Sequence, residues 1–241
     1  MKKVLVAMSG GVDSSVTAYL LKEQGYDCIG VTMKLYDGED GRENTCCSLR
    51  DVEDAKSVCH RLGIPHYTFN FTGDFYREVI EPFIRSYEQG RTPNPCIDCN
   101  RRLKFRRLYH RALELGCDYI ATGHYVLYNM TQEQLKRTLF PLGELTKPQV
   151  REIAQREGFL NAKKHDSQDI CFVPDGDYAA FIQEYTGKTY QPGPVYDVDG
   201  NKLGTHRGII HYTIGQRKGL GLALGTPMYV KATDAEKNTV T

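Results

Sequence analysis

Hydrophobic positions in the first half of the chain form two alternating patterns. Short apolar runs rich in β-branched side chains predict strands at residues 2–8, 28–35, 65–71 and 118–122. Between these runs, apolar side chains recur every three to four residues and predict helices at 12–24, 49–62, 74–88 and 100–115. Strands that alternate with helices of this length predict an α/β fold with a doubly wound parallel sheet, which binds ligands beyond the carboxyl ends of its strands.

Local signals set several of these boundaries. Ser48 and Asp51 have the spacing of a capping box at a helix start, and Gly63 is suited to end that helix. Pro82 predicts a kink in the helix at 74–88, and a Pro-rich loop follows at 92–95.

The pattern changes after His124. Two helical segments at 131–140 and 148–157 lead to a polar loop at 163–168, and the rest of the chain is rich in glycine and β-like. We therefore predict two domains, a doubly wound catalytic domain at 1–173 and a smaller, mostly β domain at 174–241.

Composition excludes several classes of protein. The chain has 241 residues, 40% of them hydrophobic, which is enough for buried cores and argues against a disordered chain. The 31 Lys and Arg residues balance 30 Asp and Glu residues, so only local charge can point to a nucleic acid. The sequence has neither a leader peptide nor an apolar run of about 18 residues, so we expect a cytoplasmic protein without a membrane partner.

The turn after the first strand is the first candidate site. It reads Ser9-Gly10-Gly11-Val12-Asp13-Ser14, and a glycine-rich turn between strand and helix directs backbone N–H groups and the helix dipole at an anion. The Gly-Lys-Ser/Thr ending of a Walker A loop is missing. The turn is suited to a pyrophosphate group, with Asp13 as a ligand of Mg²⁺, and the structural alternative is a tight turn with a Ser cap.

Cysteines supply the second candidate site. The chain has eight, which in a reducing compartment are buried, metal-binding or catalytic residues. Cys96 and Cys99 have C-x-x-C spacing directly before the helix at 100–115, where the helix dipole and nearby Arg101 and Arg102 favour a lower thiol pKa. A third thiol of interest, Cys171, lies in the polar stretch at 166–172. We interpret the other cysteines, at 28, 46, 47, 59 and 117, as structural.

The hexapeptide resembles that of the PP-loop ATP pyrophosphatases, which activate a carbonyl oxygen by transferring AMP to it. With the cysteine motifs added, the chain resembles the tRNA-specific 2-thiouridylases of that superfamily. The matching segments extend over nearly the whole chain, at 9–16, 30–33, 51–55, 92–95 with 99–100, 121–125, 166–172 and 212–221.

The resemblance implies a reaction and its site residues. The enzyme would cleave ATP to AMP and pyrophosphate with Mg²⁺ and replace O2 of the wobble uridine of tRNA by sulfur. The residues that would hold ATP are Ala7, Met8, Ser9, Gly10, Gly11, Val12, Asp13, Ser14, Met33 and Gly123. Cys171 would carry sulfur as a persulfide, and Cys99 would release it and end as its disulfide partner. Asn94, Pro95 and Cys96 would face the target base, and a cysteine desulfurase or a relay protein would donate sulfur.

This chemistry is consistent with first principles. The uracil O2 is a poor leaving group until AMP is attached to it, and a persulfide is a strong nucleophile that can then add to C2. The base must leave its stack to reach both centres.

The chain departs from the family in three places. Many members have Asp at the position of Cys96, and the Cys96, Cys99 and Cys171 set resembles a subgroup suggested to bind a [4Fe-4S] cluster through three thiols. A Lys-Asp-Gln-Ser stretch normally follows Gly-His-Tyr, whereas Val126 follows Tyr125 here. The sequence also ends at Thr241, before the family's C-terminal β-barrel.

Local charge bears on tRNA as a partner. The helix after Cys99 carries a basic cluster of Arg101, Arg102, Lys104, Arg106, Arg107 and Arg111. Residues 201–233 contain no Asp or Glu, and their cations are Lys202, Arg207, Arg217, Lys218 and Lys231. A solvated helix face is the alternative for the first cluster. Two other functions stay open, a PP-loop amidating synthetase and a non-catalytic module that binds tRNA or an iron-sulfur cluster.

Overall fold

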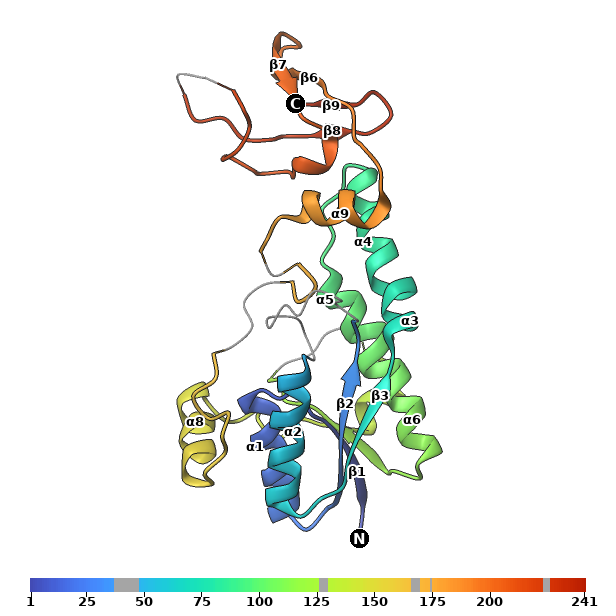
Figure 1. Cartoon of the computed structure of the whole chain (residues 1–241), viewed down its shortest axis with the longest axis vertical. Helices are drawn as coiled ribbons and strands as arrows, with labels where there is room; N and C mark the ends of the chain where they lie inside the picture. Colours follow the sequence, from blue (N-terminus) through green and yellow to red (C-terminus); the bar gives the residue numbers. More distant parts are fainter. Residues whose placement is uncertain (37–47, 126–129, 166–169, 174, 223–225) are drawn as a thin grey trace. The chain divides into compact units, whose positions relative to one another are not determined.

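The computed structural model describes residues 1–36, 48–125, 130–165, 170–173, 175–222 and 226–241 (Figure 1). The chain forms two compact units, which we call the N-terminal and the C-terminal unit. The N-terminal unit consists of Met1–Glu78 and Cys96–Pro174, and the C-terminal unit of Val79–Pro95 and Asp175–Thr241. Within the described residues, no helix is both long and apolar enough to span a membrane.

A parallel sheet forms the centre of the N-terminal unit. Its five strands are β1 (Lys3–Ala7), β2 (Asp27–Lys34), β3 (His66–Asn70), β4 (Tyr119–Ala121) and β5 (Thr138–Leu139), in the order β3-β2-β1-β4-β5. All four pairs of neighbours are parallel, which confirms the predicted doubly wound α/β fold. The prediction of a helix over 131–140 was wrong at its end, because α7 (Gln132–Lys136) stops and Thr138 and Leu139 pair with β4.

Helices α1 (Val12–Glu23), α2 (Leu49–Leu62) and α8 (Lys147–Arg156) pack with the sheet into one core. The core includes Val16 of α1, Cys59 of α2 and Ala154 of α8, all fully buried. The capping box of α2 is confirmed, since the Asp51 N–H donates to Ser48 Oγ at 3.2 Å and the Ser48 N–H donates to Asp51 at 2.9 Å.

The helix expected at 74–88 consists of three consecutive segments. They are α3 (Thr72–Phe75), the π-helical η1 (Tyr76–Ile80) and α4 (Glu81–Glu88). Pro82, the second residue of α4, has no N–H to donate to the Glu78 carbonyl, and its ring would clash with that carbonyl in a regular α-helix. The wider turn before Pro82 accommodates this, and the division between the two units falls in the same place.

The helix that carries Cys99 begins earlier than the sequence pattern predicted. Segments α5 (Pro95–Asp98), the π-helical η2 (Cys99–Arg107) and α6 (Leu108–Glu114) follow one another without a break. Pro95 is the first residue, a position where a missing N–H costs nothing. The expected start at 100 is therefore corrected, and Cys96 and Cys99 lie inside the first helical turns.

The C-terminal unit contains a mixed sheet of β6 (Gly193–Tyr196), β7 (Lys202–His206), β8 (Thr233–Asp234) and β9 (Thr239–Val240), with η3 (Ile209–His211) as a short 3-10 turn. A helix that the sequence pattern missed, α9 (Tyr178–Thr186), precedes them. Its Tyr178 and Phe181 rings pack on Phe83 of α4 at 6.1 and 6.3 Å.

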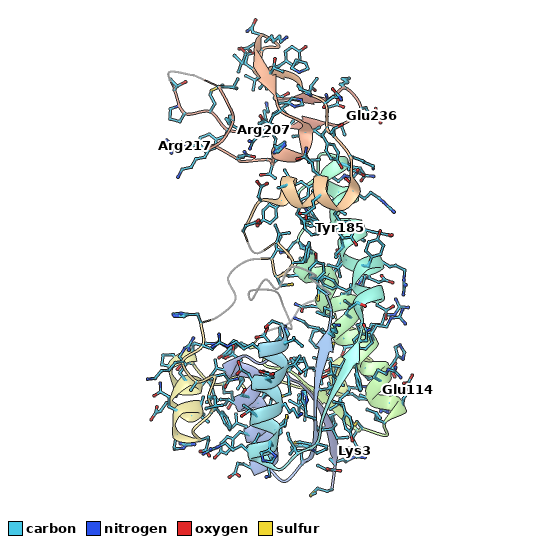
Figure 2. The ribbon with its side chains drawn as sticks, in the orientation of Figure 1. Lys3, Glu114, Tyr185, Arg207, Arg217 and Glu236 are labelled. Atoms are coloured by element: carbon cyan, nitrogen blue, oxygen red, sulfur yellow. The ribbon has the colours of Figure 1, made fainter. Side chains whose placement is uncertain are left out.

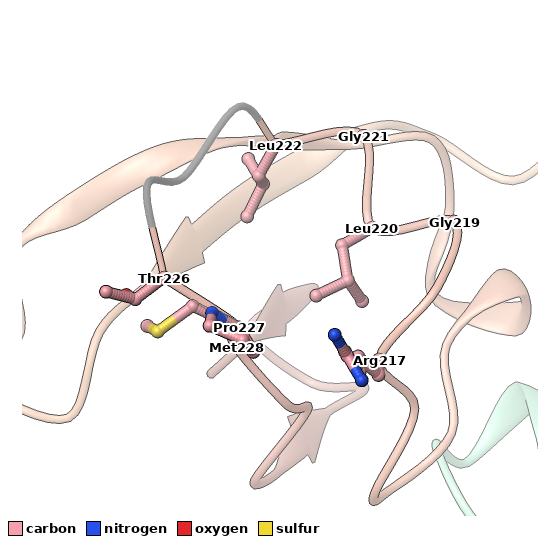
Figure 3. A pocket seen from close by; sticks show the side chains of 8 residues that line it. All are labelled: Arg217, Gly219, Leu220, Gly221, Leu222, Thr226, Pro227 and Met228. Atoms are coloured by element: carbon pink, nitrogen blue, oxygen red, sulfur yellow. The ribbon is translucent and has the colours of Figure 1, made fainter.

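An open pocket of about 510 Å³ lies in the C-terminal unit, among Arg217, Leu220, Leu222 and Met228 (Figure 3). All of its lining residues belong to 217–228, and none of them is a predicted catalytic or ATP-binding residue.

Gly30 tests how tightly β2 packs on α2. A methyl group at Gly30 would lie 2.4 Å from Cys59 Sγ and 3.3 Å from Met8 Cγ. We expect Gly30→Ala to lower the free energy of unfolding by about 1–3 kcal/mol through overpacking. The control Gly73→Ala, at an exposed position of α3, should leave stability unchanged or raise it by up to about 1 kcal/mol. Urea denaturation measures both, and a Gly30→Ala variant as stable as the parent protein would refute this packing.

Candidate functional site

The turn from β1 to α1 leaves the start of α1 uncapped. Gly11 is the N-cap residue, and no side chain in the described part of the chain caps this helix end. Gly10 has a φ of +72°, which favours glycine. The hydroxyl of Ser14 donates to the Gly11 carbonyl at 3.0 Å and so faces back into the turn. An uncapped helix start that follows a glycine turn is suited to bind phosphate.

Two glycines allow neighbouring backbone segments to approach this turn. A methyl group at Gly10 would lie 2.4 Å from the Asp51 carbonyl oxygen, and one at Gly123 would lie 2.8 Å from the Ser14 nitrogen. Gly123 follows β4, so the end of the neighbouring strand lies directly against the start of α1. The predicted contact of Gly123 with the nucleotide stays a prediction.

Asp13, the predicted Mg²⁺ ligand, is already paired in this structure. Lys147 Nζ lies 2.7 and 2.8 Å from its two carboxylate oxygens, and the Tyr125 hydroxyl donates to it at 3.0 Å. A cation that binds Asp13 must therefore compete with an ammonium group. Lys147 was not predicted; it is the first residue of α8, where a cation opposes the helix dipole and gains from a nearby carboxylate.

A second lysine, Lys164, also contacts the turn. Lys164 Nζ lies 2.6 Å from both Asp51 and Asp54 and 3.3 Å from the Gly10 carbonyl oxygen. Asn161 Nδ2 donates to the same carbonyl at 2.9 Å. The sequence predicted only a polar loop at 163–168, which includes Lys164, and gave no signal for Asn161, so both residues were missed.

Met33, the predicted adenine contact, lies near the carboxyl end of β2 and is 7% exposed. Its neighbour Thr32 donates to the Met8 carbonyl at 2.9 Å and lies 2.9 Å from His66 Nε2. These contacts place Met8 and Met33 at the same edge of the sheet as the turn.

The cysteines lie in segments that pack on α3. Cys99 is the first residue of η2 and is 8% exposed, and η2 contacts α3. Cys171 is half-buried, and the ring of the next residue, Phe172, packs on Phe75 of α3 at 5.6 Å. Both segments belong to the N-terminal unit. The described residues do not include 166–169, which belong to the stretch around Cys171, or Cys46 and Cys47.

The three residues expected to face the base differ in exposure. Asn94 and Cys96 are exposed and Pro95 is buried. Throughout the described ranges, no group of three or more Cys, His, Asp or Glu residues is placed to hold a metal ion. A [4Fe-4S] cluster on Cys96, Cys99 and Cys171 stays a prediction.

Half of the basic cluster after Cys99 forms ion pairs, namely Arg102, Arg107 and Arg111. Arg102 lies 2.6 Å from Glu78 and 3.3 Å from Asp98, and Arg107 lies 3.0 Å from Asp74. These pairs favour the solvated, structural interpretation for half of the cluster, while Arg101 and Arg106 are exposed.

The C-terminal basic stretch includes the side chains of Arg207 and Arg217 (Figure 2). His206 in the same stretch is 1% exposed, accepts a hydrogen bond from the Gly208 N–H at 3.1 Å and lies 2.9 Å from the Asn238 carbonyl. His206 is thus a structural residue.

Family models identify the relatives of this chain. The model described as tRNA methyl transferase HUP domain matches residues 2–129 and 125–175, and the tRNA methyl transferase PRC-barrel domain matches 179–241. A tRNA-specific 2-thiouridylase of Lachnoclostridium phytofermentans is 52% identical over 269 residues, covering 100% of this chain and 75% of that protein. The chain belongs to the tRNA-specific 2-thiouridylase family.

A second relative in this family, from Heliobacterium modesticaldum, is 53% identical. The match covers 98% of this chain and 69% of the relative's length. Both relatives are named 2-thiouridylases, although the family models carry a methyl transferase description. A crystal structure of a 4-thiouridine synthetase–RNA complex with bound ATP is similar at a TM-score of 0.51 and 21% identity. The match covers 77% of this chain and 50% of the synthetase chain, and it supports the fold alone.

His124 follows Gly123 at the end of β4. Its Nδ1 lies 3.0 Å from Thr122 Oγ1 and its ring packs on Phe105 at 5.7 Å. Burial, with a contribution from Lys104, lowers the pKa of His124 from 6.5 to about 4. His124 is therefore neutral at pH 7, with a hydrogen-bond partner within the protein.

This shift predicts a pH dependence of stability. Between pH 6.5 and about 4 the unfolded chain binds a proton that folded His124 does not, so stability is complete above 6.5 and falls as the pH drops through this window. The loss reaches about 3 kcal/mol near pH 4. Denaturation at pH 7 and at pH 4.5 should show that the free energy of unfolding falls less for His124→Gln than for the parent protein. The exposed control His60→Gln should match the parent; equal losses in all three proteins would contradict the assignment.

Proposed function

We propose that this protein transfers sulfur to C2 of the wobble uridine of tRNA and cleaves ATP to AMP and pyrophosphate in the process. The observation that carries this proposal is that the uncapped start of α1 and both cysteine-bearing segments belong to one compact unit. Membership of the 2-thiouridylase family supports the same reaction.

The first half of the reaction uses the turn at 9–14. Backbone N–H groups at the start of α1 would bind the ATP phosphates, with Met33 and Gly123 at the nucleotide. Mg²⁺ would offset phosphate charge, and Asp13 can bind it once Lys147 is displaced. The uracil O2 then attacks the α-phosphorus, pyrophosphate leaves, and O2 becomes part of a good leaving group.

The second half uses the two cysteines that pack on α3. The terminal sulfur of a Cys171 persulfide adds to C2 of the uracil, and AMP leaves with O2. Cys99 then attacks Cys171 Sγ, which breaks the persulfide bond, leaves the sulfur on C2 and forms a Cys99–Cys171 disulfide. An external thiol must reduce this disulfide before the next turnover.

The proposed reaction requires two partners, tRNA and a sulfur donor. Asn94, Pro95 and Cys96 would face the flipped base, and residues 174–241 would form the domain that positions tRNA. A cysteine desulfurase or a relay protein would load Cys171 with sulfur in the cytoplasm. No step is assigned to an iron-sulfur cluster.

Cys171→Ala tests this assignment. Because Cys171 acts only after adenylation, we expect the variant to lose at least about 1,000-fold in 2-thiouridine formation while it still forms AMP-tRNA. Mass spectrometry of nucleosides measures the first, and radiolabelled ATP the second. Cys117→Ala, at a buried cysteine of the same unit, is the control and should keep both activities.

Three outcomes would contradict the proposal. Thiolation by Cys171→Ala at the parent rate would exclude the persulfide role. AMP transfer to a small amide acceptor instead of tRNA would favour an amidating synthetase. A parent protein that binds tRNA without any turnover would favour a non-catalytic module.

A further inference from the structure

Two side chains from residues 161–164 hold one carbonyl in the middle of the turn. Asn161 Nδ2 lies 2.9 Å and Lys164 Nζ 3.3 Å from the Gly10 carbonyl oxygen. Asn161 also donates to Ser15 Oγ at 2.9 Å, and that hydroxyl donates to the Gly11 carbonyl at 3.0 Å. Asn161 is 3% exposed, so water does not compete for its contacts.

The Gly10 carbonyl fixes the direction of the next N–H. The C=O of Gly10 and the N–H of Gly11 belong to one planar trans peptide and point in opposite directions. With the oxygen held at Asn161 and Lys164, the N–H faces the other side of the turn. There it lies 3.4 Å from Ser9 Oγ, a long contact for an N–H donor, so this N–H can bind a better acceptor such as phosphate.

The segment that holds the carbonyl is itself braced. Arg151 of α8 donates to the carbonyls of Ala162 and Lys164 at 3.2 and 3.0 Å. The Lys164 N–H donates to the Asn161 carbonyl at 3.0 Å, and Ala162 belongs to the core. Residues 161–164 thus form a preorganised support beneath the turn.

The charge of Lys164 is balanced locally. Asp51 and Asp54 each lie 2.6 Å from its ammonium group, so two carboxylates offset one cation. Lys164 therefore offers little net positive charge to a phosphate. What it contributes to the turn is geometry.

We propose that Asn161 and Lys164 are positioning residues for ATP, which hold the Gly10–Gly11 peptide so that the Gly11 N–H donates to a phosphate oxygen. This inference rests on the proposed use of ATP. Both residues would act through the backbone of the turn.

Lys164→Met tests the inference against a purely structural role. Loss of a charged hydrogen-bond donor should raise the Kd for Mg²⁺-ATP about ten- to a hundredfold. Lys164→Arg, which keeps the donor, should restore most of the affinity. The neighbouring exposed Lys163→Met is the matched control and should bind ATP as the parent does. Calorimetry gives the Kd, and thermal unfolding reports stability separately.

A second readout follows the Gly11 N–H directly. In ¹⁵N-labelled parent protein, inorganic pyrophosphate should shift the Gly11 amide resonance, and in Lys164→Met this shift should be largely lost. A variant that is less stable but keeps the parent Kd and the Gly11 shift would overturn the inference. If Lys164→Met does not fold, Asn161→Ala removes the other donor and is judged by the same two measurements.

The two levels of the proposal fail differently. A parent protein without affinity for ATP would contradict the proposed function. In that case the pyrophosphate-induced shift of Gly11 still decides whether Lys164 orients the peptide.

Discussion

The start of α1 is uncapped, and the proposed binding of ATP depends on this feature. With glycine at the N-cap, as Gly11 is here, a helix start is less stable by roughly a few tenths of a kcal/mol than one with a capping side chain. The neighbouring α2 shows the alternative, since Ser48 and Asp51 form a complete capping box. In α1 the loss is offset by burial of its apolar face, including the fully buried Val16 and Ala18. The uncapped N–H groups are then available to an anion.

Surrounding segments keep the turn in place without filling it. Asp51 and Gly123 pack directly against its backbone, and Asn161 holds the Gly10 carbonyl. The acids beside the turn are paired with lysines, Asp13 with Lys147, and Asp51 and Asp54 with Lys164. These three carboxylates and two ammonium groups carry a formal net charge of −1, and a cation that binds Asp13 must compete with Lys147.

Sequence patterns predicted the features that depend on local structure. The four strands with clear apolar runs, the capping box at Ser48 and the turn at 9–14 were all found because their signals lie within a few residues. Strand β5 was missed because two residues carry no periodicity, and their pairing with β4 is a tertiary effect. The helix start at Pro95 was missed because a Pro-rich stretch favours a loop as readily as a first helical turn.

The long-range contacts of the site could not be predicted from the sequence. Lys147 and Lys164 lie far along the chain from Asp13 and Gly10, and no local pattern joins them. The cysteine motifs could be found because two thiols at close spacing are a chemical signal. That both motifs pack on α3 emerged only from the fold.

We propose that the turn at 9–14 presents ATP for cleavage between its α- and β-phosphates while sulfur is transferred to tRNA. The most direct test is the nucleotide balance of one reaction with Mg²⁺-ATP, tRNA and a persulfide donor. We expect one AMP and one pyrophosphate for each 2-thiouridine formed. ADP and inorganic phosphate as the products, or 2-thiouridine formed without AMP, would contradict it.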